Sequence, residues 1–377
     1  MQYRQFPKIP KDISILGFGC MRLPQTSNDS KDIDIPRAAA MVRGAIEQGV
    51  NYIDTAWGYH GGQSEPFLAK ALSEGYRERV YLATKLPSWL IKTREDMDHY
   101  LDKQLEKLNT DYIDFYMLHA LDRDRWETYC KNDVFGYLDA IKASGKVRHV
   151  GFSFHDDPES FRDIIEAYPW DFCQIQYNIL DTQVQAGSEG LTYAYERGIG
   201  IIVMEPLRGG SLTARIPEEV QQVWDSAPVK RTPAQWALRW LWNDPRITLV
   251  LSGMTTEEQV QENIDTASEA QPESLTEEEL QAVEDVRTVY LRKIQVPCTG
   301  CNYCMPCPHD VNIPGSFSMY NDAHMFNEIE ENRQKYRQML SGHEASRCTA
   351  CGTCEPLCPQ GIEIIESLKG PVSLFES

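Results

Sequence analysis

Eight of the eleven cysteines in this 377-residue chain lie in two short segments near its C-terminal end. The second segment reads C-x2-C-x2-C-x3-C-P, a spacing with which cysteines ligate 4Fe–4S clusters. The first is one residue shorter at its last gap. Zinc sites prefer paired C-x2-C knuckles separated by longer loops, so the pattern favours two 4Fe–4S clusters over two zinc ions. The predicted ligands are Cys298, Cys301, Cys304, Cys307, Cys348, Cys351, Cys354 and Cys358.

The last cysteine of each segment precedes a proline and is expected to leave its own cluster and bind the other one. Cys358 would then complete the cluster held by Cys298, Cys301 and Cys304. Cys307 would complete the cluster held by the other three. The remaining cysteines lie earlier in the chain, and we interpret them as ordinary residues with no metal role; they are Cys20, Cys130 and Cys173.

A second set of reactive side chains follows apolar, strand-like segments. Asp54 ends "YID", Lys85 ends "LATK" and His119 ends "FYMLH". Ionisable groups directly after buried strands are costly unless they are paired or lie in a cleft. Tyr59 follows Asp54 by five residues. One such residue alone is more often a hydrogen-bonded core residue, but four together predict a common site.

The segments that position these residues repeat at nearly regular intervals. Strand-like runs end near residues 54, 85, 119, 153, 177, 204 and 251, and "SILGFG" adds an eighth. Helical periodicity separates most of them, as in residues 36–49, where Ala38, Met41, Val42, Ala45 and Ile46 form one apolar face. Eight such units predict an α/β fold, a (β/α)8 TIM barrel whose strand ends meet at one mouth. A doubly wound sheet is the alternative, but no GxGxxG lies between a strand and a helix.

Composition narrows the setting of this fold. The net charge of −19 argues against nucleic acid as a partner, and no apolar run reaches the roughly 20 residues of a membrane span. The N-terminal residues lack a signal-peptide pattern, so we expect a cytoplasmic protein, in which thiols stay reduced. We predict a barrel over residues 1–270, an acidic linker helix over 271–291 and a small iron–sulfur domain over 292–377.

The first 270 residues resemble the aldo-keto reductases. The similarity is carried by "GFGCMRL", "DTAWGYHGGQSE", "LATK", "DFYMLHA", "GKVRHVGFS", "QIQYN" and "SGMTTEEQVQENI". It implies a catalytic tetrad of Asp54, Tyr59, Lys85 and His119. Tyr59 would protonate the alkoxide formed by hydride transfer, with its pKa lowered by Lys85 from a free value of about 10. Asp54 would hold Lys85, and His119 would orient the carbonyl and donate to the developing oxyanion.

The same resemblance implies NADP or NAD as cofactor. Tyr177 would stack on the nicotinamide and Ser153 and Gln176 would bind its carboxamide. Gly209 and Gly210 would lie over the pyrophosphate, and Glu262 and Asn263 would bind the adenine. Further implied contacts are Gly19, Met21, Arg22, Pro206, Leu207, Gly253 and Gln259.

Three positions depart from the family pattern. Phe154 stands where an Asn usually follows the Ser of "GFS". Gln259 and Gly253 stand where many NADPH-specific members have Arg and Lys. Because an Arg fork is the natural reader of a 2′-phosphate, the choice between NADH and NADPH stays open.

The whole chain thus resembles an aldo-keto reductase fused to a two-cluster ferredoxin-like domain, a fusion typical of anaerobes. We expect an NAD(P)H-dependent oxidoreductase that reduces a small aldehyde or ketone. Hydride transfer moves two electrons and a cubane moves one, so the clusters could be structural, or a wire from a ferredoxin or other redox partner. A non-catalytic redox-sensing or binding subunit is a third interpretation. Trp57, Trp89 and Trp126 are candidates either for an apolar substrate pocket or for ordinary packing.

Overall fold

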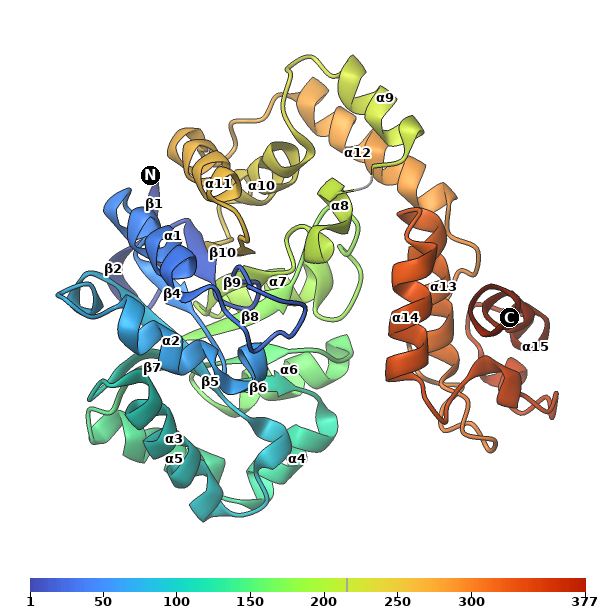
Figure 1. Ribbon diagram of the computed structural model, residues 1–377. Helices are drawn as coiled ribbons and strands as arrows, with labels where there is room; N and C mark the ends of the chain where they lie inside the picture. The colour runs from blue at the N-terminus through green and yellow to red at the C-terminus, as the bar shows by residue number, and fades with distance from the viewer. Residues whose placement is uncertain (215) are drawn as a thin grey trace. The chain divides into compact units, whose positions relative to one another are not determined.

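The computed structural model describes residues 1–214 and 216–377 and divides into two compact units (Figure 1). The first comprises residues 1–209 and 234–276, and the second comprises residues 210–233 and 277–377. None of the helices in the described residues has both the length and the apolar character that crossing a membrane requires.

The first unit is a closed barrel of eight parallel strands, as the sequence predicts. Each strand pairs with the next along the chain, and the last pairs with the first, with Leu251 opposite Gly17. The strands are β3 (Leu16–Gly19), β4 (Tyr52–Asp54), β5 (Tyr81–Leu86), β6 (Ile113–Leu121), β7 (Val147–Phe154), β8 (Phe172–Gln176), β9 (Gly200–Met204) and β10 (Leu249–Gly253). An antiparallel hairpin of β1 (Tyr3–Phe6) and β2 (Ile9–Ser14) precedes them.

Helices surround this sheet in Figure 1. They are α1 (Ile35–Glu47), α2 (Ser64–Ala71), α3 (Arg94–Leu108), α4 (Arg123–Lys131), α5 (Val134–Ala143), α6 (Pro158–Ala167), α7 (Gly187–Glu196), α10 (Pro233–Asn243) and α11 (Glu257–Glu269). Helix α1 buries the apolar face predicted from its periodicity. Helices α3 and α11 begin with capping boxes, in which Thr93 pairs with Asp96 and Thr256 with Gln259. Short 3₁₀ turns cover Tyr59–Gly62, Arg77–Arg79, Ser88–Leu90 and Arg208–Gly210.

Side chains alternate between the inside and the outside of the barrel wall. Phe172 of β8 packs in the interior cluster with Phe115 of β6 and Ile202 of β9. Its neighbour Cys173 packs in the outer cluster, between sheet and helices. Because successive strand residues face opposite sides, every second residue of β8 faces the interior.

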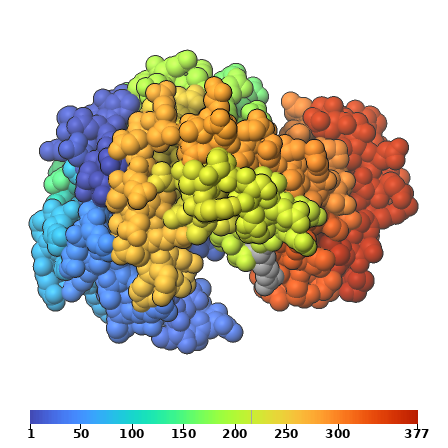
Figure 2. Space-filling model, turned by 90° about the horizontal axis from the view of Figure 1, so that it is seen from above, coloured from blue at the N-terminus to red at the C-terminus, as the bar shows by residue number. Residues whose placement is uncertain are grey.

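The second unit is helical and cysteine-rich. Its elements are α8 (Ser211–Ala214), α9 (Glu218–Ser226), α12 (Glu277–Arg292), α13 (Ile313–Met325), α14 (Ile329–Met339), α15 (Ile364–Ser367) and α16 (Lys369–Pro371), a π-helical turn Val372–Glu376, and 3₁₀ turns Ala345–Arg347 and Glu355–Leu357. Figure 2 shows the yellow-green segment of α9 against orange α12. Ion pairs stabilise this packing: Arg231–Glu279 at 2.6 Å and Lys293–Glu219 at 3.3 Å. Most of the acidic segment predicted as a linker helix forms α12, which belongs to this unit. The division of the chain into functional domains stays a prediction.

Candidate active site and cysteine pockets

Four side chains predicted to form one site lie together at the C-terminal ends of the barrel strands. Lys85 of β5 is fully buried, and its Nζ donates to Asp54 Oδ1 at 2.6 Å and to the carbonyl oxygen of Thr55 at 2.8 Å. The same Nζ lies 3.4 Å from Tyr59 Oη. The Tyr59 and His119 rings meet edge to face with centroids 6.2 Å apart. The fold therefore brings an ammonium, a carboxylate, a phenol and an imidazole together at one site.

The turn that presents Tyr59 is held by the next residue. His60 takes a left-handed conformation with φ 53°, which normally costs a side-chain-bearing residue about 1–2 kcal/mol. Its buried ring accepts a hydrogen bond from the Leu23 amide at Nε2 (3.2 Å), and Nδ1 lies 2.6 Å from the Ser30 carbonyl oxygen. These contacts tie the His60 ring to two other loops and so hold the turn beside Tyr59 in place.

Burial and charge act in opposite directions on the Lys85–Tyr59 pair. Burial lowers the pKa of Lys85, but Asp54 and Tyr59 outweigh it, so the net pKa lies above the usual value and the ammonium stays charged. Burial raises the pKa of Tyr59, and Lys85 only partly offsets this. The net pKa of Tyr59 therefore lies above 10, whereas the sequence led us to expect a lowered one. The difference arises because burial of the phenol could not be read from the sequence.

His119 is held in its neutral form. Burial, followed by the charge of Lys85, lowers its pKa well below 6.5. Its Nδ1 is buried and has no hydrogen-bond partner within residues 1–214 and 216–377. A neutral imidazole next to Tyr59 can donate one N–H to an oxygen without competing for the proton that Tyr59 carries.

The three candidate tryptophans separate into two kinds. Trp126 packs on Phe135 and Trp170, and Trp57 packs edge to face on Tyr100. Trp89 is 45% exposed, and its ring lies 5.2 Å from that of His119. Trp89 is therefore the one of the three with an open face beside the reactive side chains.

The residues predicted to bind the nicotinamide are divided by strand alternation. Ser153 is buried at the end of β7, where its Oγ accepts from the Ala120 amide at 2.7 Å. Gln176 faces the interior, and its amide donates to Asp181 at 2.9 Å. Tyr177 instead packs in the outer cluster, with its ring stacked on Trp240 at 5.5 Å and its Oη 2.9 Å from Ser188. The structure does not bring Tyr177 to the tetrad.

Two interior residues near the mouth were missed in the sequence. Gln174 is two residues after the interior Phe172, is 2% exposed, and its Oε1 has no hydrogen-bond partner among the described residues. Its Nε2 lies 3.3 Å from Sδ of Met204, the last residue of β9. The alternation in "FCQIQ" was the available signal, because it places Gln174 on the face opposite to Tyr177.

Two of the glycines predicted to bind the cofactor, Gly209 and Gly253, lie next to Arg22. Gly209 has φ 66°, and a Cβ there would lie 2.7 Å from Arg22 Nη2. A Cβ on Gly253 would lie 3.2 Å from Arg22 Cδ. Arg22 thus crosses two glycines that leave it space, and a guanidinium in such a cradle suits a phosphate.

The other predicted cofactor contacts have varied surroundings. Asn263 is buried and donates to Ser252 Oγ at 3.0 Å. The side-chain Oε1 of Gln259 accepts from the Thr255 backbone amide at 2.8 Å. Gly19 and Pro206 are buried, Leu207 and Glu262 are half-buried, Met21 is exposed, and Gly210 belongs to the second unit.

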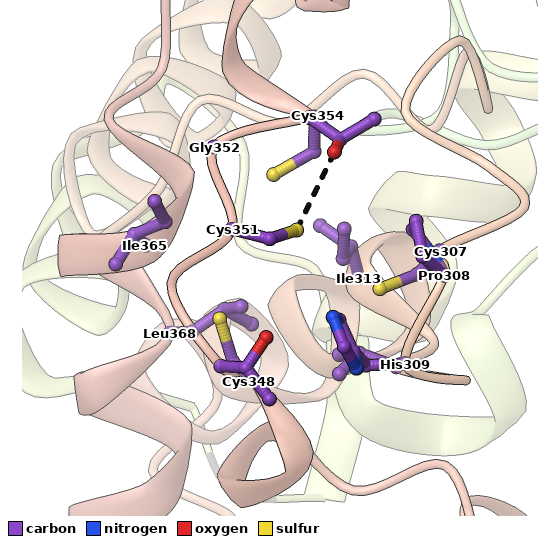
Figure 3. Close-up of a pocket in the computed structure, with 13 residues that line it drawn as sticks. Cys307, Pro308, His309, Ile313, Cys348, Cys351, Gly352, Cys354, Ile365 and Leu368 are labelled. Carbon is purple, nitrogen blue, oxygen red and sulfur yellow. Dashed lines mark hydrogen bonds between the residues drawn. The ribbon is translucent and has the colours of Figure 1, made fainter.

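One pocket of the second unit is lined by four of the predicted ligands. Figure 3 shows the sulfur atoms of Cys348, Cys351 and Cys354 around the same hollow as that of Cys307, which comes from the other segment. The pocket has a volume of about 320 Å³, including space open to solvent. Cys351 Sγ lies 3.4 Å from Thr353 Oγ1.

A second pocket is lined by the other four. This pocket has a volume of about 330 Å³, including space open to solvent. It is lined by Cys298, Cys301 and Cys304 and by Cys358 from the second segment. Ile313 lines both pockets. Burial raises the pKa of Cys304 to about 11, and the Cys298 thiol adds to the rise. Each pocket is lined by four cysteines. Four cysteine thiolates are the ligand set of a 4Fe–4S cluster, so the residues present fit that group. No three His, Cys, Asp or Glu side chains in the described chain are arranged to hold a single metal ion.

Comparison with known proteins gives two family matches. Residues 15–287 match the aldo/keto reductase family, and residues 297–363 match a 4Fe-4S dicluster domain. The NADH-specific methylglyoxal reductase of Escherichia coli is 27% identical over 294 residues, which cover 67% of this chain and 89% of that protein. The L-galactose dehydrogenase of Arabidopsis thaliana is 26% identical over 305 residues, covering 73% and 90%. The holo structure of aldo-keto reductase AKR11C1 from Bacillus halodurans is 28% identical, with a TM-score of 0.63, covering 76% and 96%.

Proposed function

The chain belongs to the aldo/keto reductase family and is an oxidoreductase, and we propose that it reduces an aldehyde or ketone with NAD(P)H, using Tyr59 as general acid. The observation that carries this proposal is the buried arrangement of Tyr59, Lys85, Asp54 and His119, with Lys85 Nζ 3.4 Å from Tyr59 Oη and 2.6 Å from Asp54. A nicotinamide, when bound, supplies the hydride.

Tyr59 delivers the proton that the reduced carbonyl oxygen needs. Its raised pKa keeps the phenol protonated at neutral pH. The Lys85 ammonium stabilises the phenolate left after transfer, and Asp54 holds that ammonium in place. Lys85 thus lowers the barrier where negative charge develops on Tyr59.

His119 orients the carbonyl for this transfer. Its imidazole is neutral and lies against the Tyr59 ring, so one N–H can donate to the carbonyl oxygen. A neutral donor stabilises the developing oxyanion without adding a second acid of low pKa to the site. The exposed face of Trp89 forms one wall for the substrate.

For cofactor binding, the structure supports a revised set of contacts. Gln174, whose buried Oε1 has no hydrogen-bond partner in residues 1–214 and 216–377, and Ser153 are available for the carboxamide. Arg22 and Gly209 are available for a phosphate. One relative is named as NADH-specific. The Gln259 side chain, at the position where NADPH-specific members have Arg, is engaged in the capping box of α11. The coenzyme preference is therefore to be measured with both NADH and NADPH.

For the second unit, we propose two 4Fe–4S clusters. Cys307, Cys348, Cys351 and Cys354 would hold one, and Cys298, Cys301, Cys304 and Cys358 the other. One-electron transfer is the chemistry that such clusters supply. A ferredoxin-linked relay is the second candidate function, and the shared Ile313 favours it, because adjacent clusters suit electron passage between them.

The test of the proposed function compares Tyr59→Phe with a matched control, Tyr195→Phe, whose side chain is 45% exposed. Tyr59→Phe should bind NAD(P)H normally and lose carbonyl-dependent oxidation by about 100-fold or more, the range assigned to general acid catalysis. Tyr195→Phe should behave as the wild type. Full activity in Tyr59→Phe would contradict the proposal.

A further inference from the structure

A buried carboxylate that the proposed mechanism does not use lies behind the tetrad. Glu65, in the first turn of α2, is fully buried. Its Oε1 accepts from Thr84 Oγ1 at 2.9 Å and from Gln104 Nε2 at 2.7 Å. Burial raises the pKa of Glu65, while these hydrogen bonds and Lys107 oppose the rise. A buried carboxylate is costly to keep, so its partners indicate what it holds in place.

One side of Glu65 fixes the strand that carries Lys85. Thr84 is the residue immediately before Lys85 in β5. Gln104 of α3 donates from the same Nε2 to the carbonyl oxygen of Lys85 at 3.0 Å. The Gln104 Oε1 accepts in turn from Tyr116 Oη of β6 at 2.8 Å. Glu65 therefore restrains the backbone of β5 from the outside of the barrel, at the residue whose side chain enters the tetrad.

The other side of Glu65 fixes the turn that carries Tyr59. Its Oε2 pairs with Lys107 Nζ at 3.4 Å. That ammonium lies 3.3 Å from the ring centroid of Trp57, two residues before Tyr59. Ser64, next to Glu65, has its Oγ 2.8 Å from Thr55 Oγ1, one residue after Asp54. The same short segment of α2 thus contacts the neighbours of Asp54 and Lys85 directly, and it reaches Trp57, near Tyr59, through Lys107.

We propose that Glu65 is a positioning residue that sets the Lys85–Tyr59 separation, through Thr84 and Gln104 on one side and through Lys107 and Trp57 on the other. This inference rests on the proposed role of Tyr59 as general acid. The separation matters because Lys85 acts on Tyr59 through a charge at 3.4 Å. An error of about 1 Å in such a contact can cost about 100-fold in rate.

The test uses two variants and a matched control on α3. Glu65→Gln keeps the shape of the side chain but removes its charge toward Lys107. Lys107→Met removes the ammonium over Trp57. Lys103→Met removes an exposed lysine of the same helix, which pairs with Glu106 outside the network. The reconstituted full-length protein is assayed for kcat and KM across pH with NAD(P)H and a carbonyl panel, beside thermal unfolding.

We expect kcat to fall about tenfold in Glu65→Gln and several-fold in Lys107→Met, with KM for the cofactor within about twofold, because only the proton-transfer geometry changes. The alkaline limb of kcat should move to higher pH. A longer Lys85–Tyr59 separation weakens the effect by which the Lys85 ammonium lowers the pKa of Tyr59. The double variant should lose less than the product of the single losses. A lower melting temperature with unchanged kcat and pH profile would overturn the proposal and leave Glu65 a purely structural role.

A second readout separates this inference from the proposed function. Incorporating 3-fluorotyrosine at position 59 allows the pKa of that phenol to be followed by fluorine NMR without turnover. The pKa should rise in Glu65→Gln and stay constant in Lys103→Met. If wild-type protein shows no carbonyl reduction but this shift is present, the proposed function fails and the positioning role stands. An unchanged pKa in Glu65→Gln refutes the positioning role whatever the activity.

Discussion

Removing the Lys85 ammonium while leaving Asp54 in place should destabilise the barrel more than removing both groups. Lys85 Nζ and Asp54 Oδ1 are 2.6 Å apart, which corresponds to about 6 kcal/mol of attraction at an effective dielectric constant of about 20. Lys85 is fully buried and Asp54 is 2% exposed, so desolvation offsets part of this. Deleting one partner of a buried pair typically costs about 3–5 kcal/mol, and we expect that for Lys85→Met at pH 7.

The double variant Asp54→Asn/Lys85→Met is the informative comparison. It leaves no unpaired charge, so it should recover most of the loss. Lys103→Met, which breaks the exposed pair with Glu106, should change stability little. Urea unfolding followed by tryptophan fluorescence measures these differences, because seven of the eight tryptophans lie in the barrel unit.

The stability of Lys85→Met should also depend on pH, in a direction set by the pKa of Asp54. Burial raises the pKa of Asp54 and Lys85 holds it down, so without Lys85 it rises further. Folded Lys85→Met then keeps a proton on Asp54 that the unfolded chain releases near pH 4. Its stability should be greatest below that pH and fall by about 1.4 kcal/mol per pH unit as pH rises, until the folded pKa is passed. A Lys85→Met variant that matches the double variant at every pH would refute this account.

Four further outcomes are expected. Because the pKa of His119 lies well below 6.5, turnover should not fall as the pH drops from about 8 to about 6.5. Below about pH 6.5 His119 gains a proton in the unfolded chain but not in the folded one, so unfolding assays should show a declining stability there. Iron and sulfide content should halve in Cys298→Ser and fall no further when Cys358→Ser is added, whereas adding Cys307→Ser instead should remove both clusters. Gly209→Ala should weaken NAD(P)H binding several-fold in fluorescence titrations, because a Cβ at this position would lie 2.7 Å from Arg22 Nη2 and displace the guanidinium proposed to bind phosphate. Trp89→Ala should raise KM for aromatic aldehydes more than for small polar ones, and equal effects on both would argue against a substrate wall.

The barrel was predictable because its signals are local. Apolar runs at intervals of about 30 residues, with helical periodicity between them, indicate βα units, and the buried face of α1 matches its pattern residue by residue. The gathering of Asp54, Lys85 and His119 also followed, since parallel strands end at one mouth.

Other features depend on contacts that the sequence does not display. The resemblance suggested Tyr177 for the nicotinamide, but the alternation of β8 turns its ring outward onto Trp240. The net direction of the Tyr59 pKa required knowledge of how deeply the phenol is buried.

The division into compact units was equally beyond the sequence. Residues 210–233 belong with α12, which lies far from them along the chain. Ion pairs such as Arg231–Glu279 join them, and neither partner is marked by a local motif.

The most direct test of the account is anaerobic mixing of the iron-reconstituted protein with NADH or NADPH, with and without a panel of small aldehydes and ketones. Nicotinamide absorbance and the visible band of the clusters are followed together. The account predicts oxidation of the nicotinamide that requires the carbonyl and is lost in Tyr59→Phe. Bleaching of the clusters by NAD(P)H without any carbonyl-dependent turnover would contradict it and favour the electron relay.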